Sequence, residues 1–203
     1  MHFSIEQSWL RLEAYLQDGG VVMLPLVAVS LLMWVLIMDR ILFFRRLHRK
    51  NMSARTAWEH IDRRSMPDPI RYRGIVSLLV AEFLAGRSGD RELDRFILDE
   101  CVQQINRRLK SYLALIGVLA AVAPLLGLLG TVTGMIATFD VLAVFGTGNA
   151  KALAGGISQA LITTQTGLLV AIPGLYMKGF LDRRATNLTQ RITTVGYFLR
   201  RHL

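Results

Sequence analysis

Three long stretches of this 203-residue chain contain no Asp, Glu, Lys or Arg, and they constrain its fold more than any other feature. They cover residues 19–38, 111–139 and 152–177. An apolar stretch of about 18 or more residues is typical of a membrane-spanning helix. Three such stretches exclude an ordinary soluble enzyme and a disordered chain. The single cysteine, Cys101, excludes a scaffold held by internal disulfides. We therefore predict an all-α membrane protein with three transmembrane helices.

The distribution of basic residues predicts how the chain is threaded. Residues 45–110 include 15 basic and 9 acidic residues, and the tail from Lys178 has 6 basic residues and one acid. The N-terminal segment and the connection 140–151 have one basic residue each. Because Lys and Arg gather on the cytoplasmic side, the large loop and the C-terminus are expected inside and the N-terminus outside. This topology explains the net charge of +9 better than nucleic-acid binding does, so no nucleic-acid partner is expected.

Seven segments follow from this topology. They are an interfacial helix on the outer face (1–18), transmembrane helix 1 (19–42), a large helical cytoplasmic loop (43–110), transmembrane helix 2 (111–140), a periplasmic turn (141–151), transmembrane helix 3 (152–178) and a cytoplasmic tail (179–203). The three acidic residues among the first 18 argue against a cleavable signal peptide, which would begin with basic residues.

The large loop is expected to be helical, with long helices that extend into the cytoplasm. Residues 75–84 are apolar except for Glu82, and a break at 86–89 precedes Asp90, which can cap the next helix. Because neither Pro nor Gly intervenes before the second apolar stretch, we expect one continuous helix from about residue 90 into the membrane. Cys101 lies on its apolar side and is expected to be an ordinary small core residue.

Small and weakly polar residues gather on one side of the second apolar stretch. At about 100° per residue, five of them fall within a sector of about 80°. They are Pro124, Gly127, Thr131, Gly134 and Thr138.

The third stretch also contains polar side chains. Gln159, Thr163 and Thr166 share a side with Pro173, whereas Thr164 and Gln165 point elsewhere. Two interpretations remain open. Small residues and threonines let helices pack closely, or these sides surround a cavity within an oligomer. The cost of a primary amide in lipid favours the cavity for the two glutamines.

The charge-free stretches contain no carboxylate, histidine or lysine, the groups from which proton relays inside membranes are usually built. A proton-conducting role would therefore need a carboxylate from a partner. There is no Gly-rich phosphate loop with a lysine and no pair of histidines at ligand spacing, and the four histidines are scattered over polar segments. We expect no enzymatic activity, no metal and no cofactor.

Two motifs give the chain a family resemblance. The segment 124–134, which reads PLLGLLGTVTG, and the segment 156–173, which reads GISQALITTQTGLLVAIP, resemble the ExbB/TolQ/MotA family of proton-channel subunits, and its ExbB branch most closely. The resemblance covers about residues 19–184 and includes the order of the spans and the large loop. It implies a multi-pass subunit of an inner-membrane motor in Gram-negative bacteria, with a periplasmic N-terminus and a cytoplasmic C-terminus.

The resemblance also implies partners and site residues. Family members form a homopentamer whose second and third spans line a lumen. An ExbD-like single-span partner in that lumen carries a protonatable Asp, and a TonB-like protein receives the work for import of iron chelates or similar ligands across the outer membrane. The family's two threonines fall on Thr131 and Thr164. Many relatives have Glu where this chain has Gln159, which cannot carry a charge and is expected to serve as a hydrogen-bonding group of the lumen.

Three alternatives to a TonB-type motor remain. A TolQ-like subunit would energise the envelope instead, a structural scaffold would use its small residues only for packing, and an autonomous channel would conduct without a partner. The missing intramembrane charges argue against the autonomous channel.

Overall fold

The computed structural model describes residues 15, 18–48, 52–68, 72, 74–146 and 150–203. Six helices are formed there, and no strand occurs among these residues. The helices are α2 (Met23–His48), α3 (Ala54–Asp62), α4 (Ile75–Gly86), α5 (Arg91–Lys110), α6 (Leu113–Phe145) and α7 (Ala150–His202). The predicted all-α class is confirmed. Apart from Tyr15 and Asp18, the interfacial helix predicted at 1–18 lies outside the described residues.

Three helical stretches are long and apolar enough to cross a membrane, as the sequence predicts. They are Met23–Leu47, Arg91–Phe145 and Ala150–His202, and the second comprises both α5 and α6. The apolar helix α4 is too short to span and its residues are largely buried within the protein. The apolar run at 75–84 is therefore core and not membrane.

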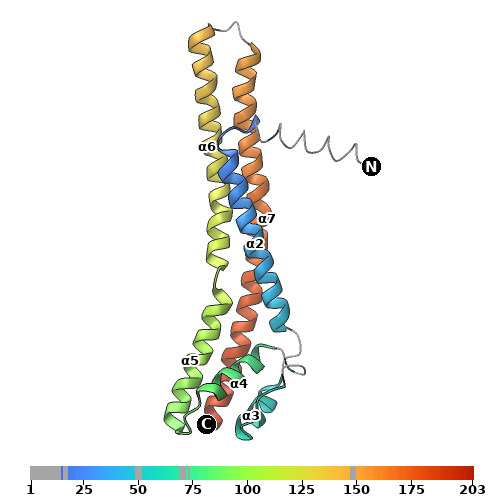
Figure 1. Cartoon of the computed structure of the whole chain (residues 1–203), viewed down its shortest axis with the longest axis vertical. Helices are drawn as coiled ribbons and strands as arrows, with labels where there is room; N and C mark the ends of the chain where they lie inside the picture. Colours follow the sequence, from blue (N-terminus) through green and yellow to red (C-terminus); the bar gives the residue numbers. More distant parts are fainter. Residues whose placement is uncertain (1–14, 16–17, 49–51, 69–71, 73, 147–149) are drawn as a thin grey trace, which may run out of the picture. The chain divides into compact units, whose positions relative to one another are not determined.

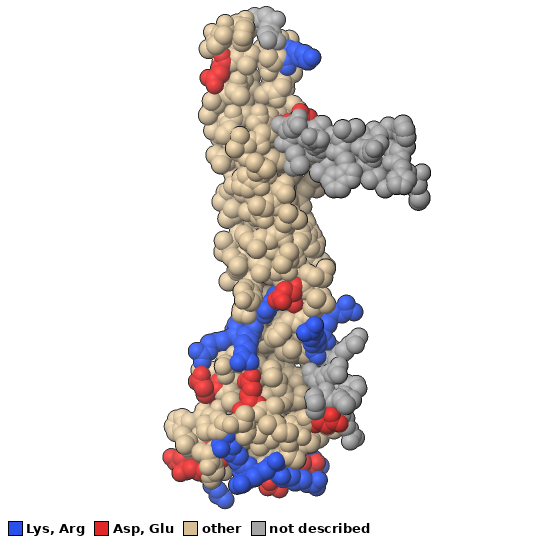
Figure 2. Space-filling model, viewed as in Figure 1, with Lys and Arg blue, Asp and Glu red and all other residues tan. Residues whose placement is uncertain are grey.

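The described chain divides into two compact units. The first consists of Met1–Leu36 and Leu115–Lys178, and the second of Ile37–Ala114 and Gly179–Leu203. In the first unit the helices α2, α6 and α7 lie side by side (Figure 1). The visible face of that unit has a long stretch without Lys, Arg, Asp or Glu (Figure 2). Such an uncharged surface suits the hydrocarbon core of a bilayer.

The three helices of the first unit meet where a glycine leaves room for them. A Cβ atom on Gly174 of α7 would lie 2.8 Å from Met33 Cε of α2 and 3.1 Å from Ala120 Cβ of α6. Met33 and Ala120 are fully buried. In contrast, large apolar side chains such as Leu31, at 64% exposure, and Leu125, at 63%, point outward. Small residues therefore lie where the helices approach most closely, and large apolar side chains cover the outside of the unit, as expected of a protein in lipid.

The second unit has its own apolar core. Most of α4 is buried there, and α5 contributes Leu98, Cys101, Ile105 and Leu109. Burial raises the pKa of the Cys101 thiol, and the nearby carboxylates of Glu82 and Glu100 raise it further. A thiol of raised pKa is unreactive, which agrees with the core role predicted for Cys101.

The start of α5 confirms the predicted cap and adds a second device. Asp90 Oδ1 accepts a hydrogen bond from Glu92 N at 2.8 Å. The buried carboxylate of Asp94 accepts bonds from Ser88 N at 2.8 Å, Ser88 Oγ at 3.0 Å and Arg87 Nε at 3.1 Å. Burial alone would raise the pKa of Asp94, but these bonds outweigh it and hold the pKa below its usual value. Asp94 thus fixes the turn between α4 and α5.

Replacement of Asp94 by asparagine should lower the free energy of unfolding of the second unit by about 2–3 kcal/mol, because it removes charged hydrogen bonds from a buried site. Since the folded pKa lies below the unfolded value, the contribution is fully present above the unfolded pKa and is lost as the pH falls through the folded one. Thermal unfolding followed by circular dichroism should show the wild-type advantage near neutral pH, narrowing below about pH 4. Asp62→Asn, at an exposed position, is the matched control, and an equal effect of both variants would contradict the assignment.

The helix predicted to run unbroken from residue 90 into the membrane is interrupted, so that prediction is wrong. α5 ends at Lys110 and α6 begins at Leu113, with Tyr112 at a φ of 64°. Arg40 of α2, which lies 71 residues before Ser111 in the sequence, binds the residues at this break. Its NH1 group donates to Ser111 Oγ at 3.1 Å and to the Arg108 carbonyl at 3.3 Å. We call this arrangement the Arg40 clamp.

The ends of other helices also differ from the expected segments. The helix α6 continues to Phe145 and α7 begins at Ala150, so most of the predicted turn 141–151 is helical. The helix α7 then runs on to His202 through the whole predicted tail. Within the large loop, the helical stretches predicted were 75–84 and the one from about residue 90, whereas a further helix, α3, forms at Ala54–Asp62, where Ser53 caps it by accepting a hydrogen bond from Thr56 N.

Candidate functional site

The membrane parts of α6 and α7 approach each other backbone to backbone. A Cβ atom on Gly127 would lie 3.0 Å from the Thr163 carbonyl oxygen, and one on Gly134 would lie 2.8 Å from Ala160 N and from the Gly156 carbonyl oxygen. Real Cβ atoms are essentially never found closer than 3.0 Å to other atoms, and a distance of 3.0 Å is tighter than nine in ten real Cβ contacts. Glycine is therefore required at position 134, and a larger residue at position 127 would need its backbone neighbours to shift.

Two of the predicted site threonines lie within this contact. Thr163 is fully buried and donates to the carbonyl oxygens of Gln159 at 3.1 Å and Ala160 at 3.0 Å. Thr138 is buried and donates to the Gly134 carbonyl at 3.0 Å. Their hydroxyl groups are thus satisfied by the backbone of their own helix, and the two side chains lie against Gly156 and Gly130 of the opposite helix.

Thr164 and Thr131 lie at the border of the same contact. Both are half-buried. Thr164 Oγ1 shares its hydrogen bond between the Gly127 carbonyl of α6, at 3.2 Å, and the Ala160 carbonyl, at 3.3 Å. Thr131 Oγ1 donates to the Leu128 carbonyl at 2.6 Å. Each hydroxyl oxygen retains accepting capacity, and each donor can be redirected to a stronger acceptor.

Thr166 and Gln159 lie toward the residues before α2. Thr166 Oγ1 is 2.8 Å from the Tyr15 hydroxyl and 2.7 Å from the Ile162 carbonyl to which it donates. The Gln159 amide lies against Gly20, where any Cβ atom would overlap it. Gly20 also has a φ of 65°, which favours glycine. The structure therefore separates the predicted side of α7, with Thr163 facing α6 and the other two facing the segment before α2.

Pro124 is the last of the nine predicted site residues. It lies inside α6 and is half-buried. A proline cannot donate the usual backbone hydrogen bond, so one carbonyl group of the preceding turn loses its normal partner. Pro173 occupies a corresponding interior position in α7. Both spans of the contact thus contain a locally weakened turn.

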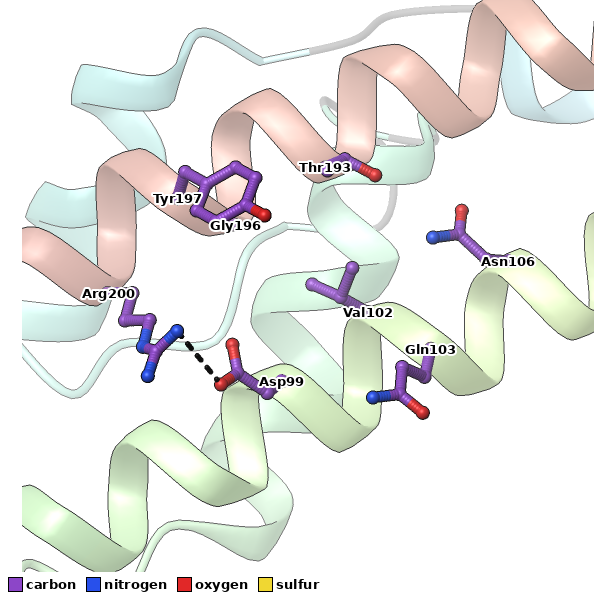
Figure 3. A pocket seen from close by; sticks show the side chains of 8 residues that line it. All are labelled: Asp99, Val102, Gln103, Asn106, Thr193, Gly196, Tyr197 and Arg200. Atoms are coloured by element: carbon purple, nitrogen blue, oxygen red, sulfur yellow. Dashed lines mark ion pairs between the residues drawn. The ribbon is translucent and has the colours of Figure 1, made fainter.

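A separate groove of about 320 Å³ lies in the second unit between α5 and the end of α7 (Figure 3). The Arg200 guanidinium faces the Asp99 carboxylate there, with an N–O distance of 3.4 Å. The Gly196 backbone meets Val102, since a Cβ atom on this glycine would lie 2.8 Å from Val102 Cγ2. This groove contains neither a cysteine nor a histidine among its lining residues, which do not suggest nucleophilic catalysis.

The α6–α7 contact offers hydroxyl groups but nothing that titrates. Its two spans contain no acidic, basic or histidine side chain between residues 111 and 139 or between 152 and 177. Within the described part of the chain, no group of three His, Cys, Asp or Glu side chains could hold a metal ion. The site can therefore donate and accept hydrogen bonds inside a membrane, but a proton that crosses there needs an ionisable group from outside this chain.

Comparison with known sequences connects this site to a family. A sequence model described as the MotA/TolQ/ExbB proton channel family matches residues 62–194, which include all of α6 and most of α7.

Individual relatives agree with this match. The chain is 35% identical over 163 residues to the putative biopolymer transport protein ExbB-like 1 of Synechocystis, covering 76% of this chain and 64% of the relative. It is 32% identical over 164 residues to ExbB-like 3 of the same organism, covering 77% and 78%. It is 32% identical over 136 residues to the biopolymer transport protein exbB1 of Vibrio cholerae, covering 64% of this chain and 58% of the relative. The chain thus spans somewhat less than two thirds of the first and third of these relatives.

Proposed function

We propose that this chain, which belongs to the MotA/TolQ/ExbB proton channel family, is the wall subunit of a proton-driven motor in the inner membrane of a Gram-negative bacterium. Its relatives are named as biopolymer transport proteins of the ExbB type. The family is one of channel and transport components and not of enzymes. The proposal extends this to a pentameric ring around an ExbD-like partner that carries the titrating aspartate, with a TonB-like protein as recipient of the work.

One observation carries the proposal. The matched region contains two closely packed spans with hydroxyl groups at the border of their contact and no ionisable side chain. A packing scaffold explains the buried threonines, Thr163 and Thr138. It also explains the bond from Thr164 to the Gly127 carbonyl, but it gives no reason for Thr131 to stand half-buried with a bond only to its own helix, and both threonines lie in the two motifs that resemble the proton-channel family.

We assign different tasks to the nine site residues. Thr131 and Thr164 would face the lumen and the partner's carboxyl group. Four residues of the contact would hold α6 and α7 together as one rigid wall: Gly127, Gly134, Thr138 and Thr163. Pro124 would shape α6. Gln159 and Thr166 would line the side toward the segment before α2, where Gln159 contributes hydrogen bonds without charge.

The proposed mechanism follows from the cost of charge in a membrane. Moving one proton inward across 100 mV releases about 2.3 kcal/mol. Protonation of the partner's aspartate removes a charge that is costly to bury, so the neutral side chain can pass the apolar sectors of the ring. The hydroxyl groups of Thr131 and Thr164 would provide the polar stations between which it moves. In the membrane orientation predicted from the basic residues, the second unit lies in the cytoplasm and the N-terminus in the periplasm.

The double variant Thr131→Val with Thr164→Val should abolish most proton-driven uptake, with at least a tenfold loss, since removing one placed hydrogen-bond donor from a charge-stabilising site costs at least this much. Uptake of a radiolabelled iron chelate into cells that depend on this chain is the measurement. Thr133→Val is the matched control, because Thr133 is half-buried on α6 and donates only to the Gly130 carbonyl of its own helix. Unchanged uptake in the double variant, with the complex intact, would show that the lumen is assigned to the wrong residues.

A TolQ-like subunit that energises the envelope is the second candidate function. The family match includes TolQ as well as ExbB, and both would use the same wall. The two are separated by the phenotype of a strain without this chain, since a Tol-type defect makes cells sensitive to detergent while uptake of iron chelates continues.

A further inference from the structure

The side chains of Ser158, Gln159 and Gln165, in the membrane part of α7, form no hydrogen bond among the described residues. Gln159 packs against Gly20, which leaves Ser158 and Gln165. Both are exposed. The neighbouring threonines differ, because Thr163, Thr164 and Thr166 all donate to backbone carbonyls. Within this uncharged span, the two exposed polar groups are therefore without a partner in the part of the chain that the structure describes.

These two residues share one side of α7. They are seven positions apart, which is close to two turns of helix. The buried side of α7 is the opposite one, where Gly156, Ala160 and Gly167 meet α6. Gln165 thus points away from the helices of its own unit, at about the middle of the uncharged stretch 152–177.

Lipid is a poor neighbour for the Gln165 amide, although exposed apolar residues such as Leu161 and Leu169 lie on the same side. A primary amide in hydrocarbon leaves two N–H donors and a carbonyl acceptor without partners, because acyl chains form no hydrogen bonds. Lys and Arg can extend toward the membrane surface, but the short side chain of a glutamine at mid-span cannot. A polar group belonging to another molecule is therefore expected against Gln165.

We propose that Ser158 and Gln165 form the side of α7 that receives a membrane-spanning helix bearing a carboxylic acid, with the Gln165 amide hydrogen-bonded to the carboxyl group. This proposal rests on the proposed function and adds two residues to its lumen. An amide fits a carboxyl group in both protonation states: its N–H donates to the carboxylate, and its N–H and carbonyl together pair with the protonated acid. The contact can therefore persist while the acid gains and loses its proton.

Photocrosslinking in native membranes identifies what covers this side. p-Benzoylphenylalanine at position 165 should yield an adduct with a single-span protein that has an acidic residue in its span, as identified by mass spectrometry. The same probe at position 31 of α2, which is also exposed and lies near mid-span, should yield none. Adducts at position 165 only with lipid or with a second copy of this chain, or no adduct at all, would overturn the proposal.

A second pair of variants tests the hydrogen bond itself. Gln165→Leu should reduce proton-driven uptake at least tenfold, whereas Gln165→Asn, which keeps the amide, should retain more than half of it. Gln165→Leu should also shift the pH at which uptake is half-maximal, because the amide contacts the titrating group. A purely structural role would lower the level of uptake in both variants without moving that pH, and this result would overturn the proposal.

The outcome separates this inference from the proposed function. If no protein with an acidic residue in its span co-purifies with the chain in mild detergent, the motor itself is wrong. If such a partner co-purifies and the Thr131 and Thr164 double variant loses uptake, but position 165 never crosslinks to the partner, only the assignment of Ser158 and Gln165 fails.

Discussion

Gly156→Ala is expected to destabilise the first unit strongly, while Gly155→Ala, one residue earlier in the same helix, is expected to leave it intact. A Cβ atom on Gly156 would overlap the Thr138 hydroxyl and lie 2.9 Å from the Gly134 carbonyl oxygen. Nothing lies within 4 Å of the corresponding atom on Gly155. Because backbone atoms of α6 cannot move aside cheaply, α6 and α7 must separate, at a cost of about 2–3 kcal/mol.

The two glycine variants form a closely matched pair. Both gain the same helix propensity, so any difference between them reports the contact and not the helix. Thermal unfolding in detergent, followed by circular dichroism, should show the Gly156→Ala midpoint lower by roughly 5–10 °C, and the Gly155→Ala midpoint unchanged or slightly higher. Proton-driven uptake should fall in Gly156→Ala, because α6 and α7 no longer pack together in their native arrangement. Equal midpoints for the two variants would show that α6 and α7 do not make this contact.

The contact between α6 and α7 agrees only in part with the sides predicted from helical spacing. Gly127 and Gly134, which were predicted to share one side of α6, do lie together, against α7. The predicted side of α7 covers two different neighbours: Thr163 faces α6, and Gln159 and Thr166 face the segment before α2. Helical spacing gives the direction of a side chain but not the helix that it meets. That these residues line a pore stays a prediction.

The spans and the class of fold were predictable because uncharged stretches of such length have few alternatives. The break before α6 was not predictable. Ser111 and Tyr112 are not strong helix breakers, and the interaction that favours the break comes from Arg40, in a distant part of the sequence. Arg40 stands beside Asp39 directly after the first uncharged stretch, and nothing in the sequence indicates its bonds to Arg108 and Ser111.

The short connection between α5 and α6 therefore depends on one side chain, and Arg40→Ala should release it. The residue is only 7% exposed. Its guanidinium forms an ion pair with Asp39 at 2.9 Å and lies 4.8 Å from the ring centre of Tyr112, in addition to its bonds with Ser111 and Arg108. Loss of these charged hydrogen bonds and of the cation–π contact should lower the free energy of unfolding of the second unit by about 3 kcal/mol.

A local readout distinguishes loss of the Arg40 clamp from general destabilisation. Lys110 ends α5 directly before the break, so trypsin should cleave after it much faster in Arg40→Ala than in the wild type under native conditions. Arg40→Lys should give an intermediate rate, because an ammonium group keeps the charge but cannot reproduce the fork of the guanidinium. Arg46→Ala, at an exposed position on the same helix, should leave the cleavage unchanged. If all three variants are cleaved at the wild-type rate, the break does not depend on Arg40, and its origin must be sought in the backbone of residues 111 and 112.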